Sequence, residues 1–407
     1  MKIPHTAGEL VRDVSTPMIH RFMRQRLGTV VGLNNIPRSG PLVVVANHSS
    51  YLDHFATLTF LHAVRPGEVW YPTKAESFEK FASRTWHESM NCYPVDRTAP
   101  GQQVFEIAQR ILDEGNILVL YPEGTRGPGK ELLPFKSGAF RMALSAGATV
   151  VPIGMVGLEG ILPKGVHIPR VGTYSASIGA PLPVPHGDDF RECARRMRDE
   201  AFRRVQKLGQ QASLNNGCAT TAQIDAIVDL AQVIIAENMS DSGLLPEEVI
   251  GRLELLLGLA SEMSKRHPGL ELQRNRVRGF SALSSVPPIR ILKVLRIGLE
   301  ARQASANYRS NDFAAYLAGR TSLLLPKHVG GGAQEASRFF LESAKRGGLM
   351  TSQAYVGLAE SRLAMGDRQG AIEAYQCARE SIRPEDQRGP RRRDRINKCL
   401  AELGVEG

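Results

Sequence analysis

The chain has 407 residues, of which 42% are hydrophobic, which is enough apolar material for more than one folded core and excludes a disordered chain. Its formal net charge is +10, from 51 basic and 41 acidic residues, which favours phosphate-bearing small molecules, anionic lipids, acidic proteins or nucleic acid as partners. The basic residues are dispersed and form no nucleic-acid-binding module, so nucleic acid is not expected.

Residues 8–27 are predicted to form an amphipathic helix with interleaved arginines, kinked at Pro17. Its apolar stripe and the edge of that stripe comprise Val11, Val14, Met18, Phe22, Ile19 and Met23. Such a helix either lies on a membrane surface or packs on its own domain, and the sequence leaves both open. No secretion-signal core and no run of eighteen apolar residues occurs, so no membrane-spanning helix is expected. Five scattered cysteines without a C-x-x-C motif are typical of a reducing cytoplasm, and no metal site is expected. We therefore expect a cytoplasmic protein, with peripheral contact to the inner face of the membrane left open.

The first half of the chain, to about residue 208, alternates strand-like apolar runs with helical segments, which predicts an α/β domain. Strands are expected at 29–33, 42–46, 68–72, 91–95, 117–121, 149–156 and 173–178. Helices are expected at 52–63, 101–114, 136–146 and 187–207.

The first chemical motif is the string NHSSYLD, which places His48 directly after the apolar strand 42–46 and Asp53 five residues later. A histidine beside a carboxylate that orients it supplies a general base. Five residues do not place two side chains on one helical face, so a bend between them is required, and Ser49 and Ser50 supply one. The alternative is structural, because Ser50-x-x-Asp53 also fits a capping box and a lone turn histidine needs no function.

The second motif, PEGTR, follows the apolar run 117–121 and contains Glu123, Gly124, Thr125 and Arg126. A carboxylate and a guanidinium in a glycine-containing turn beyond a buried strand are suited to holding an anionic substrate. The alternative is a structural ion pair between Glu123 and an arginine.

Together with two further segments, these motifs make residues 28–185 resemble the glycerolipid acyltransferase family, the enzymes that acylate glycerol-3-phosphate and lysophosphatidate. That family carries four blocks in a fixed order, here Asn47-His48-x4-Asp53, Cys92–Arg97, Tyr121–Arg126 and Val151–Ile153. Secondary matches occur at Ile36–Pro41, Lys74–Glu76 and Phe135–Gly138. In the second block, Met90, Asn91 and Cys92 stand where glycine and apolar residues are commoner, which leaves the acceptor open.

The resemblance implies that His48 is the general base and that Asp53 orients it while an acceptor hydroxyl or amine attacks an acyl thioester. Arg97 and Arg126 would clamp a phosphate of the acceptor, with Glu123 orienting this clamp or accepting an acceptor hydroxyl. Lys74 and Lys136 are further candidate anion contacts, the alternative for each being a solvated surface lysine. Direct transfer without an acyl-enzyme is expected. No cofactor is expected beyond acyl-coenzyme A or acyl carrier protein as co-substrate.

Beyond a polar linker at 209–221, strand signals vanish and residues 222–407 are predicted to be all-helical. Helices are expected at 222–238, 246–267, 288–305, 311–324, 333–346, 352–365, 369–382 and 391–403. Near 352–385, small and aromatic residues fall at the spacing of a tetratricopeptide repeat: Tyr355, Leu358, Ala359, Gly366, Ala371, Tyr375 and Ala378. An ordinary helical bundle is the alternative.

Three functions fit these features. The leading one is acyl transfer from a thioester to a hydroxyl of a small phosphate-bearing acceptor such as lysophosphatidate. The second is carrier-protein-dependent O- or N-acyl transfer in a specialised pathway, with the helical domain binding the partner. The third is a binding adaptor with an inert α/β half, which the presence of His48, Asp53, Glu123 and Arg126 disfavours.

Overall fold

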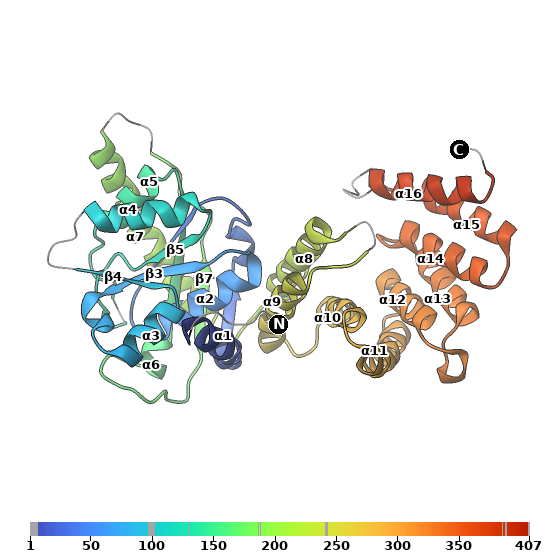
Figure 1. Cartoon of the computed structure of the whole chain (residues 1–407), viewed down its shortest axis with the longest axis horizontal. Helices are drawn as coiled ribbons and strands as arrows, with labels where there is room; N and C mark the ends of the chain where they lie inside the picture. Colours follow the sequence, from blue (N-terminus) through green and yellow to red (C-terminus); the bar gives the residue numbers. More distant parts are fainter. Residues whose placement is uncertain are drawn as a thin grey trace. The chain divides into compact units, whose positions relative to one another are not determined.

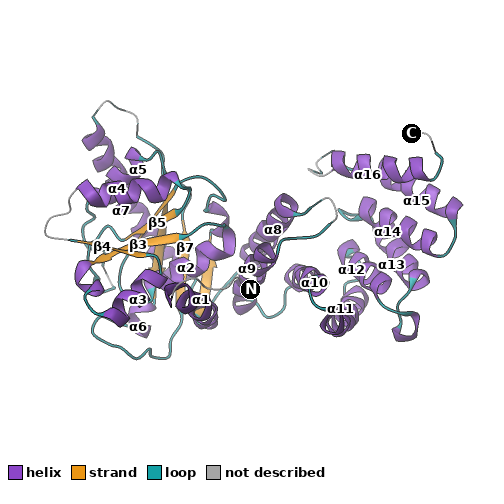
Figure 2. Cartoon of the chain, in the orientation of Figure 1, coloured by secondary structure: helices purple, strands orange, loops and turns teal. Residues whose placement is uncertain are grey.

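A computed structural model of the chain describes residues 7–96, 102–129, 131–185, 187, 189–240, 243–384, 386 and 389–405. The chain forms two compact units: unit 1 comprises Met1–Leu230 and Arg252–Lys265, and unit 2 comprises Ala231–Gly251 and Arg266–Gly407. All strands of the described residues lie in unit 1, and the described part of unit 2 is helical (Figure 2). The predicted order, an α/β domain followed by an all-helical region, is confirmed.

Unit 1 is built on a seven-stranded sheet of strand order β1-β7-β6-β2-β5-β3-β4. The strands are β1 Leu27–Val31, β2 Leu42–Ala46, β3 Val69–Lys74, β4 Cys92–Val95, β5 Ile117–Leu120, β6 Thr149–Val156 and β7 Tyr174–Ile178. All neighbouring strands pair in parallel except β6 and β7, which are antiparallel. Each of the seven predicted strands is found, within a few residues at its ends.

The central strands β2 and β5 are apolar throughout because helices cover both faces of a parallel sheet. The α-helices through residue 214 are α1 Ala7–Gln25, α2 Asp53–Val64, α3 Phe81–Ser89, α4 Gln102–Asp113, α5 Gly138–Ser145, α6 Leu158–Ile161 and α7 Phe190–Leu214. Buried residues of α4, α5 and α7 form one core cluster with Val43 and Val45 of β2 and Leu118 of β5. In Figure 1, α4 and α5 lie above β3 and β4, and α1, α3 and α6 lie below them. The short α3 was not predicted from the sequence.

The strand register brings the two sequence motifs to one edge of the sheet. Leu42 pairs with Ile117 and Val45 with Leu120, so β2 and β5 end side by side. The NHSSYLD turn follows β2, and the PEGTR turn begins two residues after β5. The carboxyl ends of parallel strands are where open α/β sheets bind ligands.

The predicted linker bounds of 209–221 are wrong. Helix α7 continues to Leu214, so only residues 215–220 separate it from α8. The start of this segment packs on the sheet: Ala212 is buried, and a Cβ on Gly154 of β6 would lie 2.2 Å from the backbone nitrogen of Gly209. The absence of a side chain at Gly154 therefore lets helix and strand approach closely, whereas a Cβ on Gly209 would meet no atom within 4 Å. The boundary at residue 222 also differs, because the division between the units falls within α8 Thr221–Asn238 and again within α9 Glu247–Met263.

The described helices that follow contact one another in chain order, each packing on the next. They are α10 Pro268–Leu283, α11 Pro287–Asn307, α12 Asp312–Leu324, α13 Ala333–Arg346, α14 Thr351–Ala364, α15 Arg368–Glu380 and α16 Gly389–Glu402. Helix α10 was missed from the sequence, although it carries a start signal: the His267 ring accepts a hydrogen bond from Leu270 N–H, and Pro268 occupies the first turn. Every helix that was predicted for this half of the chain is found.

The segment with tetratricopeptide-like spacing forms the helix pair α14 and α15. Leu358, Ala359, Ala371, Tyr375 and Ala378 share one buried cluster, with Tyr355 packed against it. Gly366 has a φ of 83°, which the turn between the helices requires. The repeat assignment itself remains a prediction.

Candidate active site

His48 and Asp53 are in direct contact. The Nδ1 atom of His48 lies 2.8 Å from Oδ2 of Asp53, a carboxylate with no exposed surface. The His48 side chain is 13% exposed, and within the described residues no hydrogen bond involves its Nε2. A carboxylate on Nδ1 leaves Nε2 as the basic nitrogen, facing away from Asp53.

Asp53 also closes the turn that carries His48. Its Oδ2 accepts hydrogen bonds from the backbone N–H groups of Ser49, at 2.7 Å, and Ser50, at 2.9 Å. The bend predicted between His48 and Asp53 is therefore made by the carboxylate itself at the start of α2. One oxygen atom therefore orients the imidazole and closes the turn before α2, whereas the N-cap of that helix is Leu52, so the capping-box alternative is not what forms.

Glu123 fastens the second motif to the first. Its Oε1 accepts a hydrogen bond from the backbone N–H of His48 at 2.6 Å, and its Oε2 accepts one from Leu133 N–H at 2.9 Å. The carbonyl oxygen of His48 accepts in turn from Gly127 N–H at 2.7 Å. Both backbone polar groups of His48 are thus held by the PEGTR turn and the residue after it. No ion pair joins Glu123 to an arginine within the described residues, and both of its oxygens are already occupied.

Two further contacts fix the histidine, and neither was assigned from the sequence. The Asn47 side chain donates to Met155 O and accepts from Met155 N, both at 2.8 Å, so it extends the sheet ladder towards β6. The His48 ring stacks on Tyr121, with centroids 4.3 Å apart and planes 20° from parallel. Both residues belong to the recognised blocks, but their contacts depend on strand order.

Arg126 lies over the ring of Tyr51, 3.5 Å from its centroid, so the two motif turns also touch through side chains. The Arg126 Nη1 atom is buried and has no hydrogen-bond partner among the described residues. A buried guanidinium nitrogen without a partner is costly unless an anion binds it. Gly124 has a φ of 71°, which favours glycine, and Thr125 is exposed.

The predicted lysines differ in placement. A Cβ on Gly124 would lie 3.0 Å from Nζ of Lys136, so Lys136 packs against the PEGTR turn. Lys74 is exposed at the carboxyl end of β3, and no contact joins it to His48, Asp53 or Arg126. Arg97 lies outside the described residues.

Several buried titratable groups lie near His48 and the PEGTR turn. Burial, together with the nearby charges of His48, His87 and Arg126, lowers the pKa of His54 well below its usual value, so its ring stays neutral. Burial raises the pKa of Cys92 to about 11 and that of Tyr121 well above its usual range. Burial likewise raises the pKa of Glu123, opposed by the hydrogen bonds from Leu133 and His48. A thiol held protonated is a poor nucleophile, which agrees with an expectation of direct transfer.

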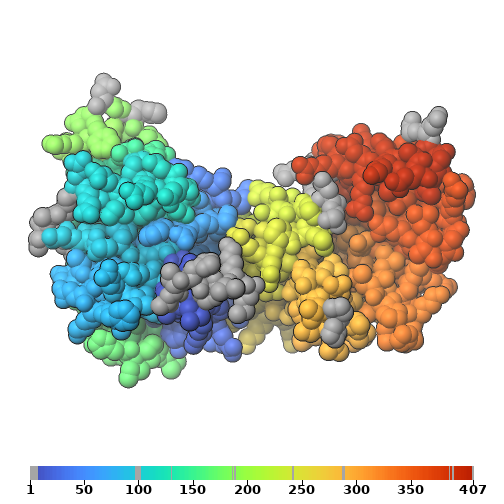
Figure 3. Space-filling model, viewed as in Figure 1, coloured from blue at the N-terminus to red at the C-terminus, as the bar shows by residue number. Residues whose placement is uncertain are grey.

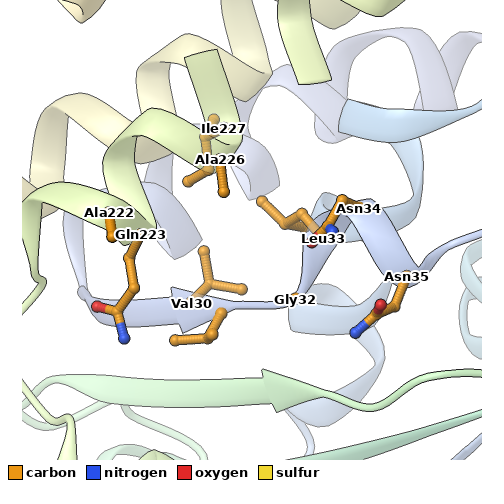
Figure 4. Close-up of a pocket in the computed structure, with 10 residues that line it drawn as sticks. Val30, Gly32, Leu33, Asn34, Asn35, Ala222, Gln223, Ala226 and Ile227 are labelled. Carbon is orange, nitrogen blue, oxygen red and sulfur yellow. The ribbon is translucent and has the colours of Figure 1, made fainter. Parts of the chain in front are cut away.

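A separate cavity of ≈ 330 Å³ in unit 1 lies between the segment after β1 and helix α8. Figure 4 shows Val30 and Leu33 on one side and Gln223, Ala226 and Ile227 on the other. Its lining has no titratable side chain and none of the motif residues. This cavity therefore offers no acid–base chemistry.

In the part of the chain that the structure describes, no three His, Cys, Asp or Glu side chains are grouped so that they could hold a metal ion. None of the described helices is both long and apolar enough to cross a bilayer.

Comparison with known proteins agrees with the motifs. A sequence model of the acyltransferase family matches residues 28–156. The chain is 34% identical over 149 residues to a chloroplastic 1-acyl-sn-glycerol-3-phosphate acyltransferase of Brassica napus, covering 33% of this chain and 39% of that protein. It is 29% identical over 161 residues to the Bacillus subtilis 1-acyl-sn-glycerol-3-phosphate acyltransferase, covering 40% of this chain and 75% of that protein.

The chain spans about two fifths of the length of the plant relative. The human 1-acyl-sn-glycerol-3-phosphate acyltransferase alpha is 30% identical over 174 residues, covering 42% of this chain and 60% of that protein. A crystal structure of a Thermotoga maritima 1-acyl-sn-glycerophosphate acyltransferase aligns with a TM-score of 0.40 and 24% identity, over 49% of this chain and 82% of that one.

Proposed function

We propose that the protein transfers an acyl group from a thioester to a hydroxyl of a small phosphate-bearing acceptor, and the match of residues 28–156 to the acyltransferase family model supports this. Lysophosphatidate is the simplest such acceptor. The proposal rests chiefly on the 2.8 Å contact between His48 and Asp53, with the opposite ring nitrogen free. The relatives named for this activity support the acceptor class.

In the proposed mechanism, Nε2 of His48 takes the proton of the acceptor hydroxyl as its oxygen attacks the thioester carbonyl. Asp53 holds the Nδ1–H tautomer and stabilises the imidazolium that forms. The new C–O bond forms, the C–S bond breaks, and the imidazolium returns its proton to the leaving thiolate. General-base assistance of this kind contributes about 10²- to 10⁴-fold in rate.

Arg126 is assigned to the acceptor phosphate because its buried Nη1 lacks a partner beside the same turn. Lys136, packed against Gly124, adds positive charge there, and Arg97 keeps its predicted role as a second clamp. Lys74 is assigned a weaker contribution because it is exposed on a neighbouring strand. Glu123 acts by positioning His48.

The test is release of free thiol by the purified full-length protein with an acyl thioester and lysophosphatidate, glycerol-3-phosphate or a phosphate-free alcohol. We expect acceptor-dependent release, greatest with a phosphate-bearing acceptor and abolished by His48→Ala. His328→Ala is the matched control, because His328 is exposed in unit 2. Activity that survives His48→Ala would refute the assignment of the base and favour the adaptor hypothesis.

A second candidate is transfer from a carrier-protein thioester to a hydroxyl or amine, and the size of unit 2 favours it. The segment matched by the family ends at residue 156, yet a helical unit with its own core clusters follows. Turnover with acyl carrier protein but not with acyl-coenzyme A would support this candidate.

We also propose peripheral membrane contact through α1. Leu10, Val14 and Met18 are spaced four residues apart and are 53%, 60% and 67% exposed, whereas Ile19 and Met23 are buried in the fold. The two alternatives for this helix therefore apply to different faces of it. Replacing the three exposed residues by serine should reduce sedimentation with anionic vesicles and leave thiol release with a short-chain, water-soluble thioester unchanged. Sedimentation that is unaffected would refute this contact.

A further inference from the structure

The helices of unit 2 enclose a hollow of ≈ 1050 Å³ that is separate from the His48 site. It is lined by residues from the end of α8, from α10 to α12, from α14 and α15, and from α16. Figure 3 shows α16, in red, on the outside of this unit, so one wall of the hollow is a surface helix. A concave surface formed by stacked helices is suited to binding another chain.

The charge of the lining is strongly basic, with seven basic and three acidic side chains. Glu360 is shared by Arg320, at 2.7 Å, and Arg395, at 3.4 Å, and Asp386 pairs with Arg392. Within the described residues, the exposed Arg383, Arg391 and Lys398 form no ion pair. The third acidic side chain, Asp394, lies three residues after Arg391 and four before Lys398, and the lining keeps a net charge of +4 (seven basic less three acidic side chains), which favours an anionic occupant.

The same lining also exposes large apolar side chains. Val233, Leu244, Leu324 and Leu349 are 37%, 49%, 54% and 68% exposed and all face this hollow. Apolar side chains gathered in a basic depression are typical of an interface with an amphipathic acidic segment. Neither nucleic acid nor a flat lipid surface matches a concave wall that carries both kinds of group.

The wall contains an unused polar group as well. Asn275 of α10 is 3% exposed, lines the hollow, and has no hydrogen-bond partner for its Nδ2 atom among the described residues. A buried amide donor without a partner is destabilising. A carboxylate or carbonyl oxygen of a bound chain would satisfy it.

We propose that this hollow is the docking site for an acidic amphipathic helix of a carrier protein that delivers the acyl thioester. The proposal rests on the proposed function, since it names the donor of that reaction. The cations Arg383, Arg391 and Lys398 pair with carboxylates of the carrier helix. Leu324 and Leu349 contact its apolar face, and Asn275 donates to one of its oxygens.

The test uses the full-length protein and acyl carrier protein, an acidic helical carrier, in two measurements. Binding of unacylated carrier by fluorescence anisotropy does not require turnover, whereas thiol release compares acyl carrier protein with acyl-coenzyme A. In Arg391→Glu/Lys398→Glu, we expect the Kd for the carrier and the KM for its acyl form to rise at least tenfold. The kinetics with acyl-coenzyme A should be unchanged. Leu349→Ser should weaken carrier binding several-fold.

The matched control is Arg309→Glu/Lys345→Glu, which makes the same charge change at exposed positions outside the hollow. This control should leave the Kd for the carrier and the kinetics with both acyl donors unchanged. The proposal is overturned if Arg391→Glu/Lys398→Glu folds and binds the carrier with an unaltered Kd. It is also overturned if both double variants weaken carrier binding equally. The proposal is also overturned if the protein binds anionic vesicles or nucleic acid but not the carrier, and Arg391→Glu/Lys398→Glu abolishes that binding. The hollow would then have another occupant. Absence of turnover with either donor, with carrier binding intact, counts against the proposed function alone.

Discussion

The Oε1 atom of Glu123 accepts a hydrogen bond from the backbone N–H of His48 at 2.6 Å, across 75 residues of sequence. Because the other carboxylate oxygen holds Leu133 N–H, Glu123 binds two segments of the site together and contacts neither the imidazole nor, in our proposal, the substrate. In the proposed mechanism, Glu123 would therefore act on the rate by setting the backbone from which His48 projects.

Glu123→Gln should lower kcat by about 10- to 100-fold and leave the KM for the acceptor little changed. Glutamine has one acceptor oxygen and cannot hold both N–H groups, and a lost hydrogen bond to a charged group is worth about 1.5–3 kcal/mol. The measurement is thiol release at varied acceptor concentration. Glu131→Gln, an exposed change in the nearby loop, is the control. A rise in KM alone would mean that Glu123 contacts the acceptor after all.

Asp53→Asn should lower kcat by at least about 10²-fold with a smaller effect on substrate affinity, because it removes the charge that stabilises the imidazolium. The asparagine oxygen can still accept from Ser49 and Ser50, so the turn should persist. Steady-state kinetics and a thermal melt together check this. Equal changes in kcat and KM, or a collapsed melting temperature, would contradict the assigned role.

Arg126→Ala should raise the KM for a phosphate-bearing acceptor by about 10- to 100-fold, the loss expected for one charge-assisted contact. Tyr51→Phe keeps the ring beneath the guanidinium and should have little effect. The comparison is made with a phosphate-free alcohol acceptor, for which Arg126→Ala should matter much less. Unaltered acceptor affinity would remove the phosphate from the proposed substrate.

The stability of unit 1 should fall as the pH drops from about 6.5 towards 4. Burial, with a contribution from the charge of His62, lowers the pKa of His20 to about 3, and burial with the charge of Arg12 lowers that of His62 to about 4. Below about pH 6.5 these two histidines are protonated in the unfolded chain but remain neutral in the folded chain. Each therefore contributes up to about 1.4 kcal/mol per pH unit to the slope of the free energy of unfolding against pH.

This prediction is checked by thermal melts between pH 4.5 and 7.5. His20→Gln/His62→Gln should flatten the dependence of the melting temperature on pH, whereas the exposed His328→Gln should not. An unchanged slope in the double variant would show that these rings titrate normally in the folded protein.

Gly154→Ala should destabilise unit 1 by about 1–3 kcal/mol, because its methyl group would meet the backbone of Leu208 and Gly209 at 2.5 Å or less. Gly160→Ala, which meets no atom within 4 Å, is the control. Chemical denaturation measures both. Equal stability of the two variants would show that α7 is free to shift on the sheet.

The sequence predicted the strands and the His48–Asp53 pair because both depend on local signals, an apolar run and a short motif at its end. The roles of Glu123, Asn47 and Tyr121 were not predictable, because each contact partner is set by strand order or by a backbone group distant in sequence. The end of α7 was mistaken for a linker because glycine and polar residues signal a loop unless a neighbouring strand is known to lie against them. Helix α10 was missed because its many charged residues obscure its apolar spacing.

The course of α7 has a practical consequence for anyone who shortens this protein. Cutting after residue 208 would remove the last turns of a helix that packs on β6, and with them the buried Ala212. It would also remove Ile227, which is 3% exposed and borders the same cavity as Leu33. Truncations meant to isolate unit 1 should therefore keep the chain through Lys265, because residues beyond 208 complete the packing of that unit.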